Sequence, residues 1–410
     1  GYMFLDKNWR KKLAVLWMAQ FVGMCAITGL ISFLPLYVSH LGITDTAEAA
    51  MWAGVLIGAA SFCAAVSNPF WGALADRKGR KPMVEKVLLM FGIIMIAMAF
   101  ATNVYQLFIL RILQGLCGGF VAASTALAVS LSPKEQIAFT IGIFQTSLIV
   151  GGAVGPMVGG LIADHFGYRQ PFFAFGLFCF LSLLLIRFSI VETFVPVVKS
   201  ERPSLKAVFT YIWSMADLRI MMLIQCLTQF AIQSIGPILP LYIRSMVVDD
   251  SNIASISGTI IAIGGIASAI ASGSMGFLIN RYSHKQIMLT ASLLGSISFL
   301  GQIAANDIVT LGIMRFLNGL CIGAMIPSSN TIITYLIPET KRGAAFGITS
   351  TFALMGNVSG PITAGFLTIA YGFQSIFWVT AVFFLLIAFL LSTRIKDYYA
   401  AIEEEKNMAV

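Results

Sequence analysis

The segment Arg111-Ile112-Leu113-Gln114-Gly115-Leu116-Cys117-Gly118-Gly119 recurs 204 residues later as Arg315-Phe316-Leu317-Asn318-Gly319-Leu320-Cys321-Ile322-Gly323. Six of the nine positions are identical, and each segment begins with an arginine inside an otherwise apolar stretch. Self-similarity at a fixed spacing indicates that the chain contains two copies of one structural unit. The fold therefore depends on what a single copy forms.

Other segments repeat at this spacing or within one residue of it. They are FLPLYV at 33–38 with ILPLYI at 238–243, GALADRKGRK at 72–81 with GFLINRYSHK at 276–285, and GP at 155–156 with GP at 360–361. We therefore expect an N-terminal bundle over residues 1–193 and a C-terminal bundle over residues 218–393. The charged and proline-containing residues 194–217 are expected to form a cytoplasmic linker, and residues 394–410 a cytoplasmic tail.

The composition indicates that these bundles are surrounded by lipid and not by water. Of the 410 residues, 58% are hydrophobic and 11% are charged, which is far more apolar than a typical soluble domain. A bilayer core requires roughly 20 apolar residues per helical span. Twelve such runs occur, near 13–38, 50–74, 83–101, 106–130, 139–163, 171–193, 218–243, 253–279, 286–304, 309–334, 344–370 and 373–393.

These runs predict an all-α membrane protein of twelve transmembrane helices in two pseudo-symmetric six-helix bundles. Two repeats with the same helix order and orientation are related by an axis along the membrane normal, and a site is expected at their interface near the midplane. Two bundles already complete a pathway, so we expect a monomer.

The positive charges predict the orientation. If both termini are cytoplasmic, 22 of the 26 Lys and Arg residues lie on that side, as the positive-inside rule requires. The net charge of +8 is then explained by topology and contact with membrane lipids, and a nucleic-acid partner is not expected.

The sequence gives little support for a cofactor, a metal site or enzymatic activity. All six cysteines lie inside apolar runs without a CxxC pair, which argues against disulfides and metal sites. Catalysis would need a nucleophile with a base or clustered metal ligands, and the three histidines and all acidic residues fall at span ends or in loops. We expect no cofactor and no enzymatic activity.

Three motifs occur in order: Gly72 to Lys81 between spans 2 and 3, the Arg111 to Gly115 run in span 4, and Gly151-x3-Gly155-Pro156-x2-Gly159-Gly160 in span 5. Together with the repeat they make the whole chain resemble the major facilitator superfamily, in particular its twelve-helix drug:proton antiporters. The stretches 51–52, 68–72 and 75–81 look most like a type of bacterial multidrug exporter. The resemblance implies the major facilitator fold and the bacterial cytoplasmic (inner) membrane.

The resemblance also implies roles for the motif residues. A conformational switch is implied for Gly72, Asp76, Arg77, Gly79 and Arg80, and proton coupling for Arg111, Gln114 and Asp76. A helix hinge is implied for Gly151, Gly155, Pro156, Gly159 and Gly160. The alternatives are a charged turn that only sets topology, an arginine that clamps two helices, and glycines that only permit close packing.

Polar residues in the spans provide candidates for the substrate cavity, because polar groups in hydrocarbon should face protein or water. Span 7 carries Gln225, Gln229 and Gln233 on one face, and their repeat partners include Gln20 and Thr28 of span 1, so Gln20 and Gln225 should oppose each other. We add Gln145, Arg315, Asn318 and Asn357, with Tyr37 and Tyr242 near the outer mouth. Hydrogen bonding between helices is the alternative role of each.

No acidic residue lies in the middle of a span. A carboxylate that could hold either a proton or a drug cation is therefore missing, and Asp76, Glu85 and Asp164 are the nearest titratable groups. We expect a secondary active transporter that exports small, amphipathic, drug-like molecules by alternating access in exchange for protons. The alternative is an exporter or uniporter of an endogenous metabolite, such as a siderophore, sugar or lipid, without carboxylate-based proton coupling.

Overall fold

The computed structural model describes residues 8–192, 205–338 and 342–396, and its regular elements within these ranges are helices. Eleven of them are long and apolar enough to cross a membrane, and a bent pair formed by residues 206–214 and 216–234 raises the number to twelve. The prediction of an all-helical membrane protein is confirmed.

The N-terminal half contains eight α-helices. They are α1 (Trp9–Thr28), α2 (Leu34–His40), α3 (Thr46–Lys78), α4 (Arg80–Ala99), α5 (Val104–Leu116), α6 (Phe120–Leu131), α7 (Ile137–Phe166) and α8 (Gln170–Ser189), with the short 3-10 helix η1 (Lys134–Gln136) before α7. Helix α4 packs on α8, and α1 packs on α7 and α8.

The C-terminal half repeats this order after an additional helix, α9 (Leu205–Ser214), which lies in the predicted linker. Its other helices are α10 (Ala216–Ser234), α11 (Leu239–Met246), η3 (Asp250–Asn252), α12 (Ile253–Gly273), α13 (Met275–Leu278), α14 (His284–Ala304), α15 (Ile308–Leu336), α16 (Arg342–Tyr371) and α17 (Ser375–Arg394). Residues 194–204 of the predicted linker and 397–410 of the predicted tail lie outside the described residues, and the predicted domain boundaries stay a prediction.

The first span of each half is broken, although the sequence predicted continuous runs over 13–38 and 218–243. Pro35 and Pro240 lie in the first turn of α2 and α11, where a residue without a backbone N–H is tolerated but cannot continue the preceding helix.

The Tyr37 hydroxyl donates to the Met98 carbonyl, and the Tyr242 hydroxyl donates to the Gln302 carbonyl. The repeat in sequence thus extends to individual hydrogen bonds, and both tyrosines are buried in their own halves.

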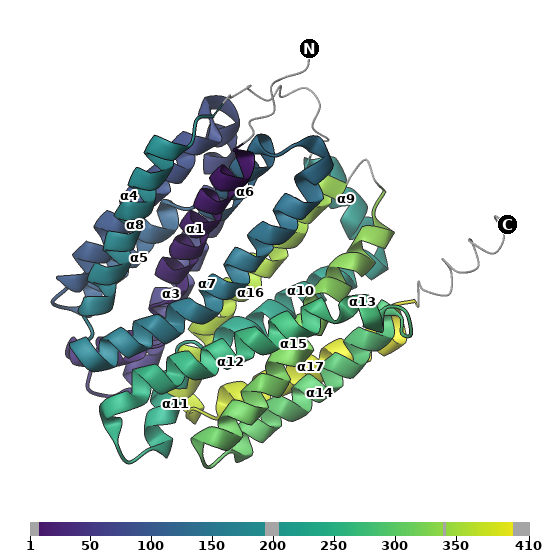
Figure 1. Ribbon diagram of the computed structural model, residues 1–410. Coiled ribbons are helices and arrows are strands. Elements are labelled where there is room, and N and C mark those ends of the chain that lie inside the picture. Colours follow the sequence, from purple (N-terminus) through teal and green to yellow (C-terminus); the bar gives the residue numbers. More distant parts are fainter. Residues whose placement is uncertain (1–7, 193–204, 339–341, 397–410) are drawn as a thin grey trace.

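The two halves meet at one end. Helix α7 packs on α12, and α3 packs on α16, with such close approach that a Cβ atom on Gly160 would lie 2.2 Å from the Ala254 carbonyl oxygen and one on Gly54 would lie 2.3 Å from that of Pro361. Figure 1 shows α7 and α12 converging at the lower left and the two halves diverging toward the upper right.

Toward the other ends of these helices the glycines have no such neighbours. A Cβ atom added there would meet nothing within 4 Å at Gly72 of α3, Gly142 of α7, Gly273 of α12 or Gly347 of α16. The end where the halves diverge is the one that carries the basic turns at 77–81 and 281–285.

Candidate transport site

The fourth span, predicted as one run over 106–130, is broken between α5 and α6. Gly119 has a φ of +88°, in the left-handed region that glycine tolerates. The repeat partner of Gly118 is Ile322, and α15 runs through that region without interruption. The glycine pair of the first copy therefore accounts for a break that the second copy lacks.

Side chains from α3 and α4 bond the carbonyls at this break. Ser67 Oγ donates to the Gly115 carbonyl at 3.1 Å, Trp71 Nε1 to the Leu116 carbonyl at 2.7 Å, and Lys86 Nζ to the Gly118 carbonyl at 3.4 Å. Carbonyls freed at a helix end need such partners where water is scarce. The Lys86 ammonium also lies 3.2 Å from the centre of the Trp71 ring, in a cation–π contact.

A pocket of about 870 Å³ lies beside this break, between α1, α3, α4, α5 and α6. Its polar lining includes Asn68, Asp76, Arg80, Arg111 and Gln114, and most of the remainder is apolar or glycine. Among the lining residues, Asp76 carries the single carboxylate. The pocket thus combines an apolar volume suited to a small molecule with a few convergent polar groups.

Arg111 lies at the inner wall of this pocket and is 7% exposed. Its Nε donates to the Leu56 carbonyl at 3.2 Å, and its Nη1 donates to Gln114 Oε1 at 2.7 Å. Two other groups of the lining, Gln114 Nε2 and Asn68 Oδ1, are buried without a hydrogen-bond partner among the described residues. Unsatisfied buried polar groups in a pocket are candidates for contact with a bound molecule or water.

The switch residues predicted from the sequence surround the turn between α3 and α4. Gly79 has a φ of +107°, which explains the need for glycine there. Gly72, Asp76 and Arg80 line the pocket, and Arg77 is exposed.

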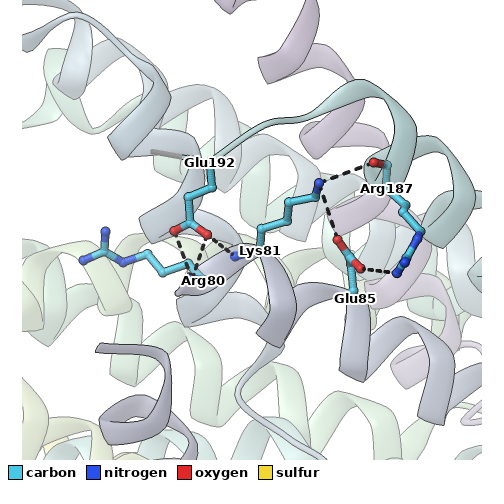
Figure 2. A network of polar contacts seen from close by, with 5 residues as sticks. All are labelled: Arg80, Lys81, Glu85, Arg187 and Glu192. Carbon is cyan, nitrogen blue, oxygen red and sulfur yellow. Dashed lines mark hydrogen bonds and ion pairs between the residues drawn. The ribbon is translucent and has the colours of Figure 1, made fainter. Parts of the chain in front are cut away.

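Figure 2 shows how this turn is fixed to the end of α8. The Glu192 carboxylate accepts hydrogen bonds from the backbone N–H groups of Arg80 and Lys81, at 3.0 and 2.9 Å. Glu85 pairs with Lys81 at 3.7 Å and with Arg187 at 3.3 Å. Glu192 therefore caps the N-terminus of α4 from more than a hundred residues away, where its charge also complements the helix dipole.

The predicted hinge residues form a face of α7 that packs backbone to backbone. A Cβ atom on Gly155 would lie 2.9 Å from Cys25 Cα, and one on Gly159 would lie 2.4 Å from the Gly29 carbonyl oxygen, both in the first span. Gly160 and Pro156 face α12 instead, and Gly151 faces α1 at Met24. The face thus contacts both its own half and the other half.

Asp164, near the end of α7, bridges the halves where they meet. Its Oδ2 accepts a hydrogen bond from the Ser255 backbone N–H of α12 at 2.6 Å. Burial raises the pKa of nearby Tyr168, and the Asp164 carboxylate adds to that rise while Arg244 opposes it.

The predicted cavity residues have partners in their own halves. Gln20 is fully buried and donates to the Phe144 carbonyl of α7, whereas Gln225 donates to Asn330 of α15. Thr28 donates to the Met24 and Gly151 carbonyls, and Asn318 to Ser298 of α14. Gln20 and Gln225 therefore do not bond each other in this conformation.

The other members of this set are Gln145, which is exposed, Gln229 and Gln233, which are half-buried, and Arg315 and Asn357, which each hold a buried polar atom without a partner among the described residues. None of the nine lines the pocket beside α5. Their role in a substrate cavity stays a prediction.

Sequence reasoning missed Asn68, Trp71, Lys86 and Glu192. Residue 86 fell inside the predicted span 83–101 but was given no role; α4 begins at Arg80, which places Lys86 nearly two turns inside the helix. The glycine pair present only in the first copy of the repeat was the available signal for the break that Trp71 and Lys86 cap.

The profile described as Major Facilitator Superfamily matches residues 16–273 and 221–407 of this chain. The chain belongs to the major facilitator superfamily. Among superfamily relatives, the multidrug resistance protein MdtG of Rahnella sp. (strain Y9602) is 35% identical over 374 residues, which cover 91% of this chain and 91% of that protein. MdtG of Escherichia coli (strain K12 / DH10B) is also 35% identical, over 91% of this chain and 92% of that protein.

Solved structures of the superfamily agree in fold. A bacterial homologue of the human lysosomal transporter Spinster, in an inward-facing and unoccupied conformation, aligns with a TM-score of 0.78 at 15% identity, covering 94% of this chain and 97% of that one. The human organic anion transporter MFSD10 aligns with a TM-score of 0.67 at 19% identity, covering 94% and 100%. As a superfamily member, the chain is a multi-pass membrane transporter of small molecules and not an enzyme.

Proposed function

We propose that this protein exports small, amphipathic, drug-like molecules across the bacterial inner membrane by alternating access, in exchange for protons. The family and the MdtG relatives, which are named as multidrug resistance proteins, support drug efflux. The observation that carries the mechanism is the asymmetry of the interface: the halves touch through glycines at one end and diverge at the other.

Both termini are proposed to be cytoplasmic, which follows from the distribution of basic residues. In that orientation the halves diverge toward the cytoplasm, so that the pocket beside α5 is presented to molecules from inside. The Spinster homologue that this chain resembles was solved in an inward-facing state, which supports the same reading. A monomer is proposed.

Asp76 and Arg111 are the proposed coupling groups. Both line the same pocket, and Asp76 is the one carboxylate there. A proton on Asp76 would change the net charge around the pocket. The guanidinium of Arg111 is held at the pocket by a hydrogen bond of 2.7 Å from its Nη1 to Gln114 Oε1. The turn containing Gly72, Asp76, Arg77, Gly79 and Arg80 is proposed as the conformational switch, because it lies where the halves must approach when the other end separates.

The α7 face made by Gly151, Gly155, Pro156, Gly159 and Gly160 is proposed as the hinge. It contacts α1 within its own half and α12 across the interface, so a change in its packing would move the halves relative to each other. The polar residues of the first, fifth, seventh, tenth and eleventh spans are proposed to line the substrate path in some conformation of the cycle.

The second candidate is an exporter or uniporter of an endogenous metabolite. It is favoured by the buried Arg111, whose described hydrogen bonds go to a carbonyl oxygen and an amide oxygen, both neutral groups. Its positive charge suits a neutral or anionic substrate better than a simple cation. The structural likeness to a protein named as an organic anion transporter agrees with such a substrate.

The test is a proton-flux measurement in proteoliposomes that hold the purified full-length protein under an imposed proton gradient. Lipophilic cations, neutral antibiotics and anionic metabolites are added in turn, and the internal pH is followed with a dye. Asp76→Asn and Arg111→Ala are compared with Glu135→Gln, which neutralises an exposed acid in the turn before α7.

Proton movement that is triggered by lipophilic compounds, kept in Glu135→Gln and lost in the other two variants is the expected result. Substrate movement with no proton flux would exclude antiport and favour the uniporter. Equal flux in all variants would exclude Asp76 and Arg111 as the coupling groups.

A further inference from the structure

The C-terminal half carries a groove whose lining residues belong to none of the proposed coupling, switch, hinge or substrate-path sets. It measures about 460 Å³ and lies between α13, α14 and α15, lined mainly by apolar side chains such as Leu278, Ile287, Ala291 and Leu320. Its lining residues Tyr282 and Leu294 are 51% and 54% exposed. The groove is therefore open to the surroundings of the bundle.

The repeat shows what occupies this place in the N-terminal half. Position 290 corresponds to Lys86 and position 275 to Trp71, and these two residues form the cation–π contact beside the break in span 4. The C-terminal copy has Thr290 and Met275 instead. The side chains that cross this region in one half have been replaced by smaller or uncharged ones in the other.

The charges differ in the same way around the start of α14, where Tyr282 and Gln286 line the groove next to Arg281 and Lys285 in the sequence. In the N-terminal half, Lys81 pairs with Glu85, and Asp76 lies in the preceding helix. The repeat partners of Arg77 and Lys81 are Arg281 and Lys285, so these two basic residues are kept, whereas Lys78 and Arg80 are replaced by Tyr282 and His284. The repeat partners of Glu85 and Asp76 are Leu289 and Asn280, so both acids are gone. Within the described ranges, Arg281 and Lys285 form no ion pair.

We propose that this groove binds an anionic phospholipid, with one acyl chain between α14 and α15 and the headgroup phosphate at Arg281 and Lys285. Basic side chains at the end of a transmembrane helix lie at headgroup level, where they attract anionic lipids. The apolar lining is complementary to a hydrocarbon chain, and the two positive charges favour a negative headgroup over a zwitterionic one.

The test is native mass spectrometry of the purified full-length protein titrated with phosphatidylglycerol or phosphatidylcholine of identical acyl chains. Two basic side chains near an anionic surface are expected to contribute about thirtyfold in affinity. Arg281→Gln with Lys285→Gln should therefore weaken phosphatidylglycerol binding by about that factor and leave phosphatidylcholine binding unchanged. Arg394→Gln with Lys396→Gln, which removes two exposed charges at the end of α17, is the control and should leave both unchanged.

A second variant separates the groove from general attraction to a basic surface. Thr290 is an exposed lining residue, so Thr290→Trp should fill the groove without disturbing the core and weaken binding of the lipid, while sn-glycerol 3-phosphate, which lacks acyl chains, should not compete. Equal losses in the Arg281/Lys285 and Arg394/Lys396 variants, or unchanged binding in Thr290→Trp, would overturn the proposal. Competition by sn-glycerol 3-phosphate would show an anion site and would also overturn it.

Discussion

Replacing Gly160 with alanine should shift this transporter away from the conformation described above. A Cβ atom at position 160 would lie 2.2 Å from the Ala254 carbonyl oxygen and 2.7 Å from its carbon, whereas real Cβ contacts essentially never fall below 3.0 Å. The two atoms are backbone, so no side chain can rotate away. Helices α7 and α12 must therefore separate by about 0.8 Å at the end where the halves meet.

Overpacking of this kind typically destabilises the packed state by ~1–3 kcal/mol. That energy corresponds to a shift of about fivefold to 150-fold between two conformations if the contact is absent from the other one. Alanine also raises helix propensity by ~1 kcal/mol, in both conformations alike. Gly152→Ala is the matched control, because it makes the same change on the same helix, where a Cβ atom meets nothing within 4 Å.

The assay is a distance measurement between spin labels at Gly142 of α7 and Gly273 of α12, in a background in which the six native cysteines are replaced. Both glycines lie toward the diverging ends and have open surroundings. Gly160→Ala should increase the short-distance population, and Gly152→Ala should not. The reasoning is refuted if the two variants give the same distribution or if Gly160→Ala lengthens the distance.

Three other predictions concern single groups. Glu192→Ala should destabilise the start of α4 by ~1–2 kcal/mol, because a charged cap is lost; amide exchange at residues 80 and 81 should accelerate about tenfold, whereas Glu135→Ala should leave it unchanged. Trp71→Phe keeps an aromatic ring beside Lys86 but removes the donor to the Leu116 carbonyl, and should lower the free energy of unfolding by ~1 kcal/mol in a denaturant titration; no change would mean that water replaces the indole. Hydrogen bonds from Thr310 at the start of α15 lower the pKa of Asp307. Protection of the Thr310 amide against hydrogen exchange should therefore be present above the pKa that Asp307 has in the unfolded chain, and should decline as the pH falls through the lower pKa of the folded state. Asp307→Asn should abolish this pH dependence, and a dependence that persists in the variant would point to another group.

The sequence predicted the fold class because the signals for it are local and repeated. Runs of about 20 apolar residues are dictated by the thickness of the bilayer, and the copies of the 111–119 segment establish two related halves wherever those halves lie in space. The resemblance of the motifs to those of the superfamily also led to Asp76, Arg111 and Gln114, which line one pocket.

The partners of polar groups could not be predicted in the same way. The stripe of Gln225, Gln229 and Gln233 was correctly placed on one helix, but a helical period does not reveal which neighbour a side chain will bond. Gln225 is bonded to Asn330 of α15, and Gln20 is bonded within its own half. Such contacts depend on helix crossing points, which are set by side-chain packing.

The amino-acid sequence by itself determined the apolar spans, the duplication and the separation of charge along the chain, because each of these is a property of consecutive residues or of their period. The tertiary structure decided the end at which the halves touch, the break that separates α5 from α6, and the capping of α4 by Glu192. The contact between the halves and the capping of α4 join residues far apart in the sequence, and the break depends on whether Lys86 can reach the freed Gly118 carbonyl. Their physical reason is that a polar group excluded from water must find whichever partner the packing brings within hydrogen-bond distance.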